Sequence, residues 1–560
     1  MKQVLMEVLS NLKDANLLLG CLCGLGVIFL LSNKRKSRKI DDATTKLLTC
    51  VEPPTSDIAH MCDALYSPPI TSDEAECADH LREIIRGKDF LRYKSLETDP
   101  EKLLRISKNV GDGEMNGALL TRFTVQFNLF AGSIVAMGTQ PQRETLYATQ
   151  DNGSLGCFAF TECGAGVLSG AVVETTAAYD PKTGSFRIHS GTETSKKKWI
   201  SQGMFAEYAV ICANLMLEDG TKNGGPHLFY ARIQHRNPKT GKMTPVKGVS
   251  ISTLNQKTAL LGLDNAFISF DQFEVEHSCL LNRFSSVDLE TGDYSLHLPA
   301  GVTRMVDLLI SRLLTGRICL SECTTNYSLA LCRRSWAFAS SRELWKGKKP
   351  KGLLISELPL MQAAFVDYSR TLSIISSFIG QARGKVAKCI QDDKFTYGVV
   401  EETCISKFVG TSFAVDAVSV LRKMLGSQAL YAESFLGASS FVCNATCAAE
   451  GDNTIMELKI VQDMFRGRTS LFPISLLLSS LGFRQGRRVV FEYLKKIGYA
   501  MLIREAALKD GQLLKDIAWC RAHLIIMNTV RGLKGGAAPP AGWLDSYESV
   551  LIKFPMPVQC

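Results

Sequence analysis

The sequence lacks the features that mark several specialised classes of protein. Of its 560 residues, 46% are hydrophobic and 21% charged, a composition that excludes collagen, a coiled coil and a wholly disordered chain. No segment repeats at a fixed period. The formal net charge of +9, from 64 basic and 55 acidic residues, is not gathered in one long tail. This charge suits an anionic ligand, and we expect no nucleic-acid partner.

Cysteine is too sparse for a disulfide scaffold. The 18 cysteines are scattered through apolar stretches, such as those around Cys212 and Cys319, which is typical of reduced thiols in a reducing compartment. Cys443 and Cys447 form a spaced pair, but no second pair or histidine cluster completes a zinc site. We therefore expect no metal centre.

A long apolar run near the N-terminus is the clearest targeting feature. Residues 17–31 carry no charge, and five basic residues follow within residues 34–39. Fifteen helical residues reach about 22 Å, which is short for a hydrocarbon core of roughly 30 Å. No small-residue cleavage site precedes the basic cluster, and the positive-inside rule leaves the C-terminal part on the cytosolic or an equivalent face. We expect a membrane anchor; an amphipathic or cleaved organellar presequence is the alternative.

Hydrophobic periodicity divides the rest of the chain into regions. After a proline-containing stretch the spacing is helical, then short β-branched and aromatic segments alternate with turns, and afterwards the helical period returns. Phe186 and Ile188, for example, alternate with Arg187 and His189 as in a half-buried strand. The fold class is therefore α+β. The expected divisions are an anchor with its basic stop (1–40), a linker (41–80), an N-terminal helical domain (81–150), a central β-domain (151–290), a helical domain (291–465) and a C-terminal helical extension (466–560).

Three motifs in the β-domain occur in the order found in a known superfamily. Residues 160–166 (FTECGAG) resemble the T-E-x-G-x-G stretch of acyl-CoA dehydrogenases and oxidases, and residues 198–201 (KWIS) resemble their W-I-T strand beside the flavin. Residues 262–265 (GLDN) follow, in a spelling closer to acyl-CoA oxidases. The resemblance implies that Thr161, Gly166, Trp199 and Ser201 contact FAD.

Two further motifs lie in the helical part. Residues 338–345 (FASSRELW) resemble the helix end whose arginine, here Arg342, reaches the FAD pyrophosphate of a neighbouring subunit, so the resemblance implies a homodimer. A guanidinium group suits a diphosphate because its fork can bond two oxygens at once. Residues 449–454 (AEGDNT) resemble the E-G-D-N-T of acyl-CoA oxidases, which makes Glu450 the catalytic base. The alternative is that residues 450–453 are only a polar turn before a helix.

Two segments depart from the family pattern. Val167 and Leu168 stand where the family usually has serine followed by aspartate or asparagine. Residues 426–430 (GSQAL) replace a G-G-x-G-Y turn that lets backbone approach the FAD, and two glycines able to adopt positive φ are lost. Either this segment has become helical with the cofactor placed differently, or FAD binding is weakened.

The resemblance implies a fold and an activity. The fold is an N-terminal helical domain, a central β-barrel-like domain, and a C-terminal four-helix bundle with an additional helical extension. The activity is FAD-dependent oxidation of fatty acyl-CoA to trans-2-enoyl-CoA, with O2 reoxidising the flavin to give H2O2. The alternatives are an acyl-CoA dehydrogenase that uses a flavoprotein electron acceptor, and a catalytically weak membrane-anchored scaffold. A peroxisome is one candidate organelle, although the chain ends in PVQC, unlike the Ser-Lys-Leu signal.

Overall fold

The computed structural model divides the chain into two compact units. Unit 1 comprises Met1–Thr49, Ser335–Phe378 and Met456–Cys560, and unit 2 comprises Cys50–Arg334 and Ile379–Ile455. Residues 1–39 of the expected anchor and most of the expected C-terminal extension lie outside the described residues. The structure describes residues 40–110, 117–166, 172–217, 222–289, 291–299, 302, 305–309, 311–344, 352–431, 433–466, 468, 511–533, 538–540, 543, 544 and 547.

Unit 2 begins with a group of helices. Asp73 caps α5 by accepting from the backbone N–H groups of Ala75 and Glu76, and Leu81 and Ile85 on that helix are fully buried. A π-helical segment interrupts the helix that runs from Gly117 to Met137. The elements are α4 (Ser56–Tyr66), α5 (Glu74–Arg86), α6 (Ser95–Thr98), α7 (Pro100–Asn109), α8 (Gly117–Thr124), the π-helix η1 (Val125–Ala131), α9 (Gly132–Met137) and α10 (Gln140–Asp151).

The structure differs from the expected linker over residues 41–80. Helices α3 (Asp42–Thr49) and α4 occupy much of this range, and α5 begins within it. On α4 the side chains of Ile58, Met61 and Leu65 form a buried stripe at helical spacing. The prolines of this region lie outside α4 and therefore do not interrupt it.

The middle of unit 2 is made of strands, so the predicted order of helices, strands and helices is confirmed. The largest sheet has six strands in the order β1-β5-β2-β3-β11, with β6 paired to β5. A second sheet has the order β4-β10-β9, and two strand pairs complete the region. The strands are β1 (Gly156–Ala159), β2 (Thr176–Asp180), β3 (Ser185–His189), β4 (Lys197–Ser201), β5 (Tyr208–Leu217), β6 (Lys222–Arg232), β7 (Gln234–Arg236), β8 (Met243–Pro245), β9 (Val249–Thr253), β10 (Asn265–Phe270), β11 (Phe273–Glu276), β12 (Ser285–Val287) and β13 (Tyr294–Leu296).

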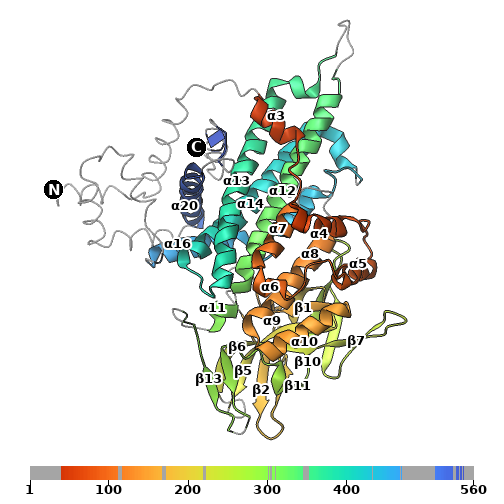
Figure 1. Ribbon diagram of the computed structural model, residues 1–560, viewed down its shortest axis with the longest axis vertical. Coiled ribbons are helices and arrows are strands. Elements are labelled where there is room, and N and C mark those ends of the chain that lie inside the picture. The colour runs from red at the N-terminus through yellow and green to blue at the C-terminus, as the bar shows by residue number, and fades with distance from the viewer. Residues whose placement is uncertain are drawn as a thin grey trace, which may run out of the picture. The chain divides into compact units, whose positions relative to one another are not determined.

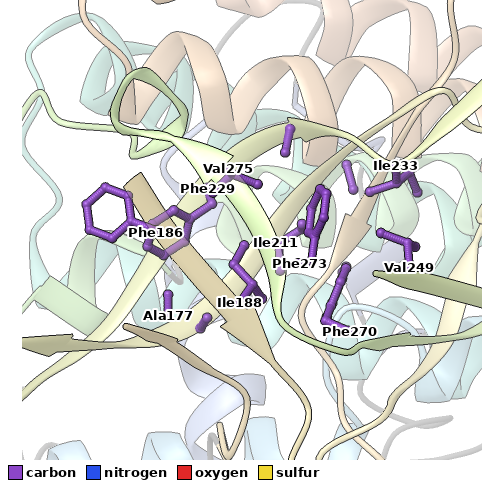
Figure 2. Packing of buried hydrophobic residues seen from close by; sticks show 14 of the residues in the cluster. Ala177, Phe186, Ile188, Ile211, Phe229, Ile233, Val249, Phe270, Phe273 and Val275 are labelled. Atoms are coloured by element: carbon purple, nitrogen blue, oxygen red, sulfur yellow. The ribbon is translucent and has the colours of Figure 1, made fainter. Parts of the chain in front are cut away.

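The strands enclose a hydrophobic core. Figure 2 shows side chains from several strands meeting there, among them Phe186, Ile188 and Phe229. The Phe186 and Phe229 rings pack edge to face at 5.2 Å between centroids. The predicted alternation on β3 is confirmed, since Phe186 and Ile188 are fully buried whereas Arg187 is exposed.

The sheet also packs closely on the helices, because a Cβ on Gly156 of β1 would lie 2.3 Å from the Phe130 ring of η1. Figure 1 shows α9 and α10 beside β1.

Long helices follow the strands. Those of unit 2 pack tightly: a Cβ on Gly410 of α14 would lie 3.0 Å from Oγ1 of Thr325 on α12 and 3.4 Å from Cδ1 of Ile379 on α13. The β-barrel-like domain and the four-helix bundle that the family resemblance implies stay predictions. The elements are α11 (Met305–Leu309), α12 (Ser311–Ser341), α13 (Pro359–Gln391), α14 (Tyr397–Leu425), the 3-10 helix η5 (Gly426–Leu430), α15 (Ser439–Ala448), α16 (Asn453–Phe465) and α20 (Gly511–Arg531).

Unit 1 combines α3, parts of α12 and α13, most of α16, and α20. Arg370 on α13 donates from Nε to Oγ1 of Thr44 at 2.8 Å and pairs with Asp41 at 2.9 Å. The indole N–H of Trp519 on α20 donates to Oε1 of Glu457 on α16 at 3.0 Å. Side-chain contacts thus join the first two stretches of sequence in this unit and hold α16 against α20 within the third.

Two stretches of the described part are long and apolar enough to cross a membrane, Gly117–Met137 and Tyr397–Leu430. In their most apolar windows, 83% and 72% of the residues are buried inside the protein. Both therefore pack as core helices do.

Candidate functional site

The first two sequence motifs lie against each other in unit 2. The backbone N–H of Lys198 donates to the carbonyl oxygen of Thr161 at 2.9 Å, so the loop at residues 161–166 runs beside the start of β4. Nζ of Lys197 pairs with Oε1 of Glu162 at 2.7 Å, and both side chains are fully buried. Lys197 also donates to the carbonyl of Cys212 at 2.6 Å. A buried ion pair therefore fixes the loop to the strand.

This arrangement leaves three of the predicted cofactor residues exposed, whereas Ser201 is half-buried. Thr161 and Gly166 are exposed, and a Cβ built on Gly166 would meet no heavy atom within 4 Å. Trp199 has positive φ (61°) and is 55% exposed, which is unusual for a large aromatic side chain on a strand. Val167 and Leu168, which depart from the family pattern, lie outside the described residues.

The third motif packs beside Ser201. Asn265 on β10 pairs with Ser201 in register and donates from Nδ2 to its Oγ at 3.0 Å. The preceding residue, Asp264, forms a fully buried ion pair with Arg122 on α8 at 2.7 Å. The GLDN motif therefore joins the second sheet to the N-terminal helices and orients the Ser201 hydroxyl.

Arg342 belongs to unit 1. It follows the C-terminal end of α12 in unit 1, whereas Thr161, Gly166, Trp199, Ser201 and Glu450 all belong to unit 2. Its guanidinium group is exposed and lies 5.4 Å from the centroid of the Phe338 ring. The predicted role of Arg342 toward a pyrophosphate stays a prediction.

Glu450 lies in the turn between α15 and α16, with positive φ (56°). Its carboxyl group sits where the side chain of residue 316 would otherwise be: a Cβ on Gly316 would lie 2.3 Å from Oε1 of Glu450 and 2.8 Å from Nδ2 of Asn128. Although residue 450 as a whole is half-buried, its Oε2 is inaccessible to solvent. The proposed base is thus an internal carboxyl group beside an amide.

Burial raises the pKa of Glu450 to about 7, and the cations of Arg317 and Lys407 oppose the rise. Desolvation disfavours the charged carboxylate more than these cations favour it. A base of this pKa exchanges a proton near neutral pH, which is the range in which general bases work best.

Two buried or half-buried cations hold the turn of Glu450. Arg317 donates from Nε to the carbonyl oxygen of Glu450 at 3.1 Å. Nζ of Lys407 donates to the carbonyl of Cys447, to the carbonyl of Gly451 at 2.7 Å and to Oδ1 of Asn453 at 2.7 Å. These contacts fix the backbone on both sides of the carboxyl group.

The π-helix η1 links the two halves of the site. Gln126 accepts with Oε1 from the side-chain amide of Gln202, directly after Ser201, at 2.7 Å and from the N–H of Gly156 at 2.9 Å. Asn128, two residues further along η1, lies at Gly316 beside Glu450. π-Helical turns are frequent at functional sites.

The sequence singled out Glu450 as the candidate base but did not predict the residues around it. Gly316, Arg317 and Asn128 belong to no local motif that would mark them. Lys407 carried a usable signal, since a lone lysine in the otherwise uncharged stretch of residues 403–415 predicts either a solvated position or a buried cation with dedicated partners.

The segment at residues 426–430 is helical, as the first of the two alternatives expected for the segment itself; the placement and strength of FAD binding stay predictions. It forms the 3-10 helix η5, in which Gly426 keeps a positive φ of 66°. Leu430 and Tyr431 are 75% and 55% exposed. Within the described residues, no group of three or more histidine, cysteine, aspartate or glutamate side chains is placed to hold a metal ion.

The fold is that of the acyl-CoA oxidases and dehydrogenases. Acyl-CoA oxidase 3 of Yarrowia lipolytica matches 93% of this chain and 81% of its own with a TM-score of 0.68 and 18% identity. Acyl-CoA oxidase-2 of Caenorhabditis elegans, solved with FAD, ascaroside-CoA and ATP, matches 93% and 82% with a TM-score of 0.66 and 18% identity. An acyl-CoA dehydrogenase of Geobacillus kaustophilus matches 72% and 93% with a TM-score of 0.51 and 15% identity.

Sequence relatives point to the oxidases. The peroxisomal acyl-coenzyme A oxidase 2 of Arabidopsis thaliana is 25% identical over 406 residues, 70% of this chain and 56% of its own. The human peroxisomal acyl-coenzyme A oxidase 3 is 25% identical over 380 residues, 66% of this chain and 53% of its own. No family model matches the chain. The resemblance to this superfamily, closer to its oxidases, is confirmed, and the chain spans about half the length of the curated relatives it matches.

Proposed function

We propose that this chain is an FAD-dependent oxidoreductase that converts fatty acyl-CoA to trans-2-enoyl-CoA, with Glu450 as the base and O2 as the electron acceptor. The observation that carries the proposal is the buried Glu450 carboxyl group, with its pKa raised to about 7, in a turn spelled as in acyl-CoA oxidases. A turn that served only to start a helix would place its glutamate in solvent, because burial of an ionisable group without a function is costly.

The residues at β4 fit a flavin. The backbone hydrogen bond from Lys198 to Thr161 places Thr161 beside β4, the strand that carries Trp199 and Ser201. The exposed indole of Trp199 offers an apolar surface that a planar ring would cover. When bound, FAD supplies the acceptor for the hydride that leaves the substrate Cβ. Arg342 would serve the pyrophosphate of a second subunit, so the proposal includes a homodimer.

The chain's own residues perform the proton transfer. The α-hydrogen of a thioester is only weakly acidic, so its removal requires a base positioned against it and a site without bulk water. Glu450 would take this proton on a carboxylate oxygen. Gly316 supplies the space for that oxygen, and the Asn128 amide borders it. The carboxylate is present above about pH 7, so we expect kcat/KM to rise with pH through that value.

Replacing the base tests the proposal. Glu450→Gln should keep bound flavin but lower palmitoyl-CoA turnover by several orders of magnitude, because the proton has no other acceptor. Glu433→Gln, an exposed position in the same unit, is the matched control and should leave turnover unchanged. The test measures flavin absorbance and acyl-CoA oxidation on the full chain. An active Glu450→Gln variant would contradict the assignment of the base.

The electron acceptor requires a second measurement. Oxygen consumption with stoichiometric H2O2 on addition of palmitoyl-CoA is the expected result for an oxidase. Turnover only in the presence of an electron-transferring flavoprotein would identify a dehydrogenase instead. A purified protein without flavin absorbance, after FAD has been supplied, would favour the scaffold.

A further inference from the structure

The turn that carries Glu450 is strained and therefore needs support from outside. Glu450 has a φ of 56° and Gly451 a φ of 94°. Positive φ is costly for a residue with a side chain, and it persists only where surrounding contacts impose it. At such a turn, loss of the supporting contacts would let residue 450 relax to negative φ and carry its carboxyl group away from Gly316.

Lys407 supplies much of that support. It lies in the middle of α14, its side chain is fully buried, and its ammonium group donates to acceptors before and after Glu450, namely the carbonyls of Cys447 and Gly451 and the side-chain oxygen of Asn453. All three acceptors are uncharged, and no carboxylate oxygen is among them. A buried ammonium satisfied only by neutral oxygens is expensive to keep.

The contacts of Asn453 extend the arrangement. Its Nδ2 donates to Oγ1 of Thr411 at 3.0 Å and to Oγ of Ser412 at 2.9 Å. Three residues of α14, Lys407, Thr411 and Ser412, therefore form hydrogen bonds with Asn453, the first residue of α16. Arg317 holds the carbonyl of Glu450 itself from α12.

We propose that Lys407 is a positioning residue for the proposed base: its ammonium group ties both ends of the turn to α14 and so keeps the Glu450 carboxyl group against Gly316. This inference rests on the proposed function. A purely structural role is the competing explanation, because Cys447 lies in the last turn of α15 and a cation there would stabilise the helix end.

Lys407→Met separates the two roles, since methionine retains much of the apolar length and removes the three hydrogen bonds. We expect kcat per bound flavin to fall by about 100-fold while KM for palmitoyl-CoA changes less than threefold. Lys423→Met, at an exposed position on the same helix, is the control and should change neither value. A purely structural lysine would lower the melting temperature and leave kcat per bound flavin unchanged, which would overturn the proposal.

A readout without turnover accompanies the kinetics. In the flavin-free protein, amide hydrogen exchange of the peptide covering residues 446–456 should be at least tenfold faster in Lys407→Met, with exchange in the β-sheet unchanged. Unchanged exchange in this peptide would overturn the proposal. Should Glu450→Gln remain active, the proposed function fails, and the exchange measurement still decides whether Lys407 holds the turn.

A second variant covers the case in which Lys407→Met does not fold. Asn453→Ala removes one of the three acceptors and leaves the lysine in place. We expect kcat per bound flavin to fall about tenfold and exchange at residues 446–456 to rise. An Asn453→Ala protein with the kcat and exchange of the unmodified chain would overturn the proposal as well.

Discussion

At the scale of single residues, the site depends on a missing side chain. Gly316 has no Cβ, and the carboxyl group of Glu450 fills the space. Gly316→Ala should therefore displace that group and lower kcat by about 100-fold, measured as acyl-CoA oxidation per bound flavin. Gly380→Ala is the matched control, because a Cβ there meets no atom within 4 Å and alanine favours a helix. Equal kcat in the two variants would contradict the expectation.

The ionisation of Glu450 also predicts how stability depends on pH. The pKa of its carboxyl group is about 7 in the folded state and 4.5 for an ordinary glutamate. The stability that its protonated form contributes is therefore complete below pH 4.5 and lost as the pH rises through 7. Glu450→Gln cannot ionise, so at pH 8 it should exceed the unmodified chain in unfolding free energy by roughly 3 kcal/mol. Urea unfolding of the variant and of the unmodified chain at pH 5 and pH 8 measures this difference in unfolding free energy. The same difference at both pH values would contradict the prediction.

At the scale of elements, the Lys197–Glu162 pair joins the 161–166 loop to β4. Lys197→Met would leave Glu162 buried without its cation, and removal of one member of a buried ion pair costs about 3–5 kcal/mol. Denaturant unfolding should show that loss, with altered Trp199 fluorescence. The double variant Lys197→Met/Glu162→Gln should recover part of the stability, because glutamine carries no charge. A double variant no more stable than the single one would argue against the ion pair.

Individual helices, strands and turns differ in how well the sequence predicts them. The alternation of Phe186 and Ile188 predicted β3 because a strand's side-chain period is local. The EGDNT spelling marked Glu450 as the proposed base, and the turn before a helix was the alternative interpretation. Helix α4 was missed because flanking prolines suggested a linker. The sequence could mark Lys407 only as a lone lysine in an uncharged stretch, and it could not mark Gly316 at all. Their roles arise from contacts between α12, α14 and a turn more than 40 residues distant in sequence from each.

At the scale of the whole molecule, the N-terminal segment is the expected membrane anchor. Deletion of residues 1–40 should release the protein from membranes into the carbonate-soluble fraction, because the apolar run and its basic stop are removed, while flavin content and turnover stay unchanged. Membrane fractionation of the full and shortened chains measures this. If the full-length chain is expressed and the recovered protein is soluble and lacks residue 1, the N-terminal segment is instead a cleaved presequence.

The π-helix η1 contacts both halves of the proposed site. Because Gln126 serves the strand side and Asn128 the carboxyl side, deletion of a single residue between them would turn one against the other by about 100° of helix rotation. For the proposed activity, a change of length by one residue in segment 125–131 should therefore be more damaging than a substitution there.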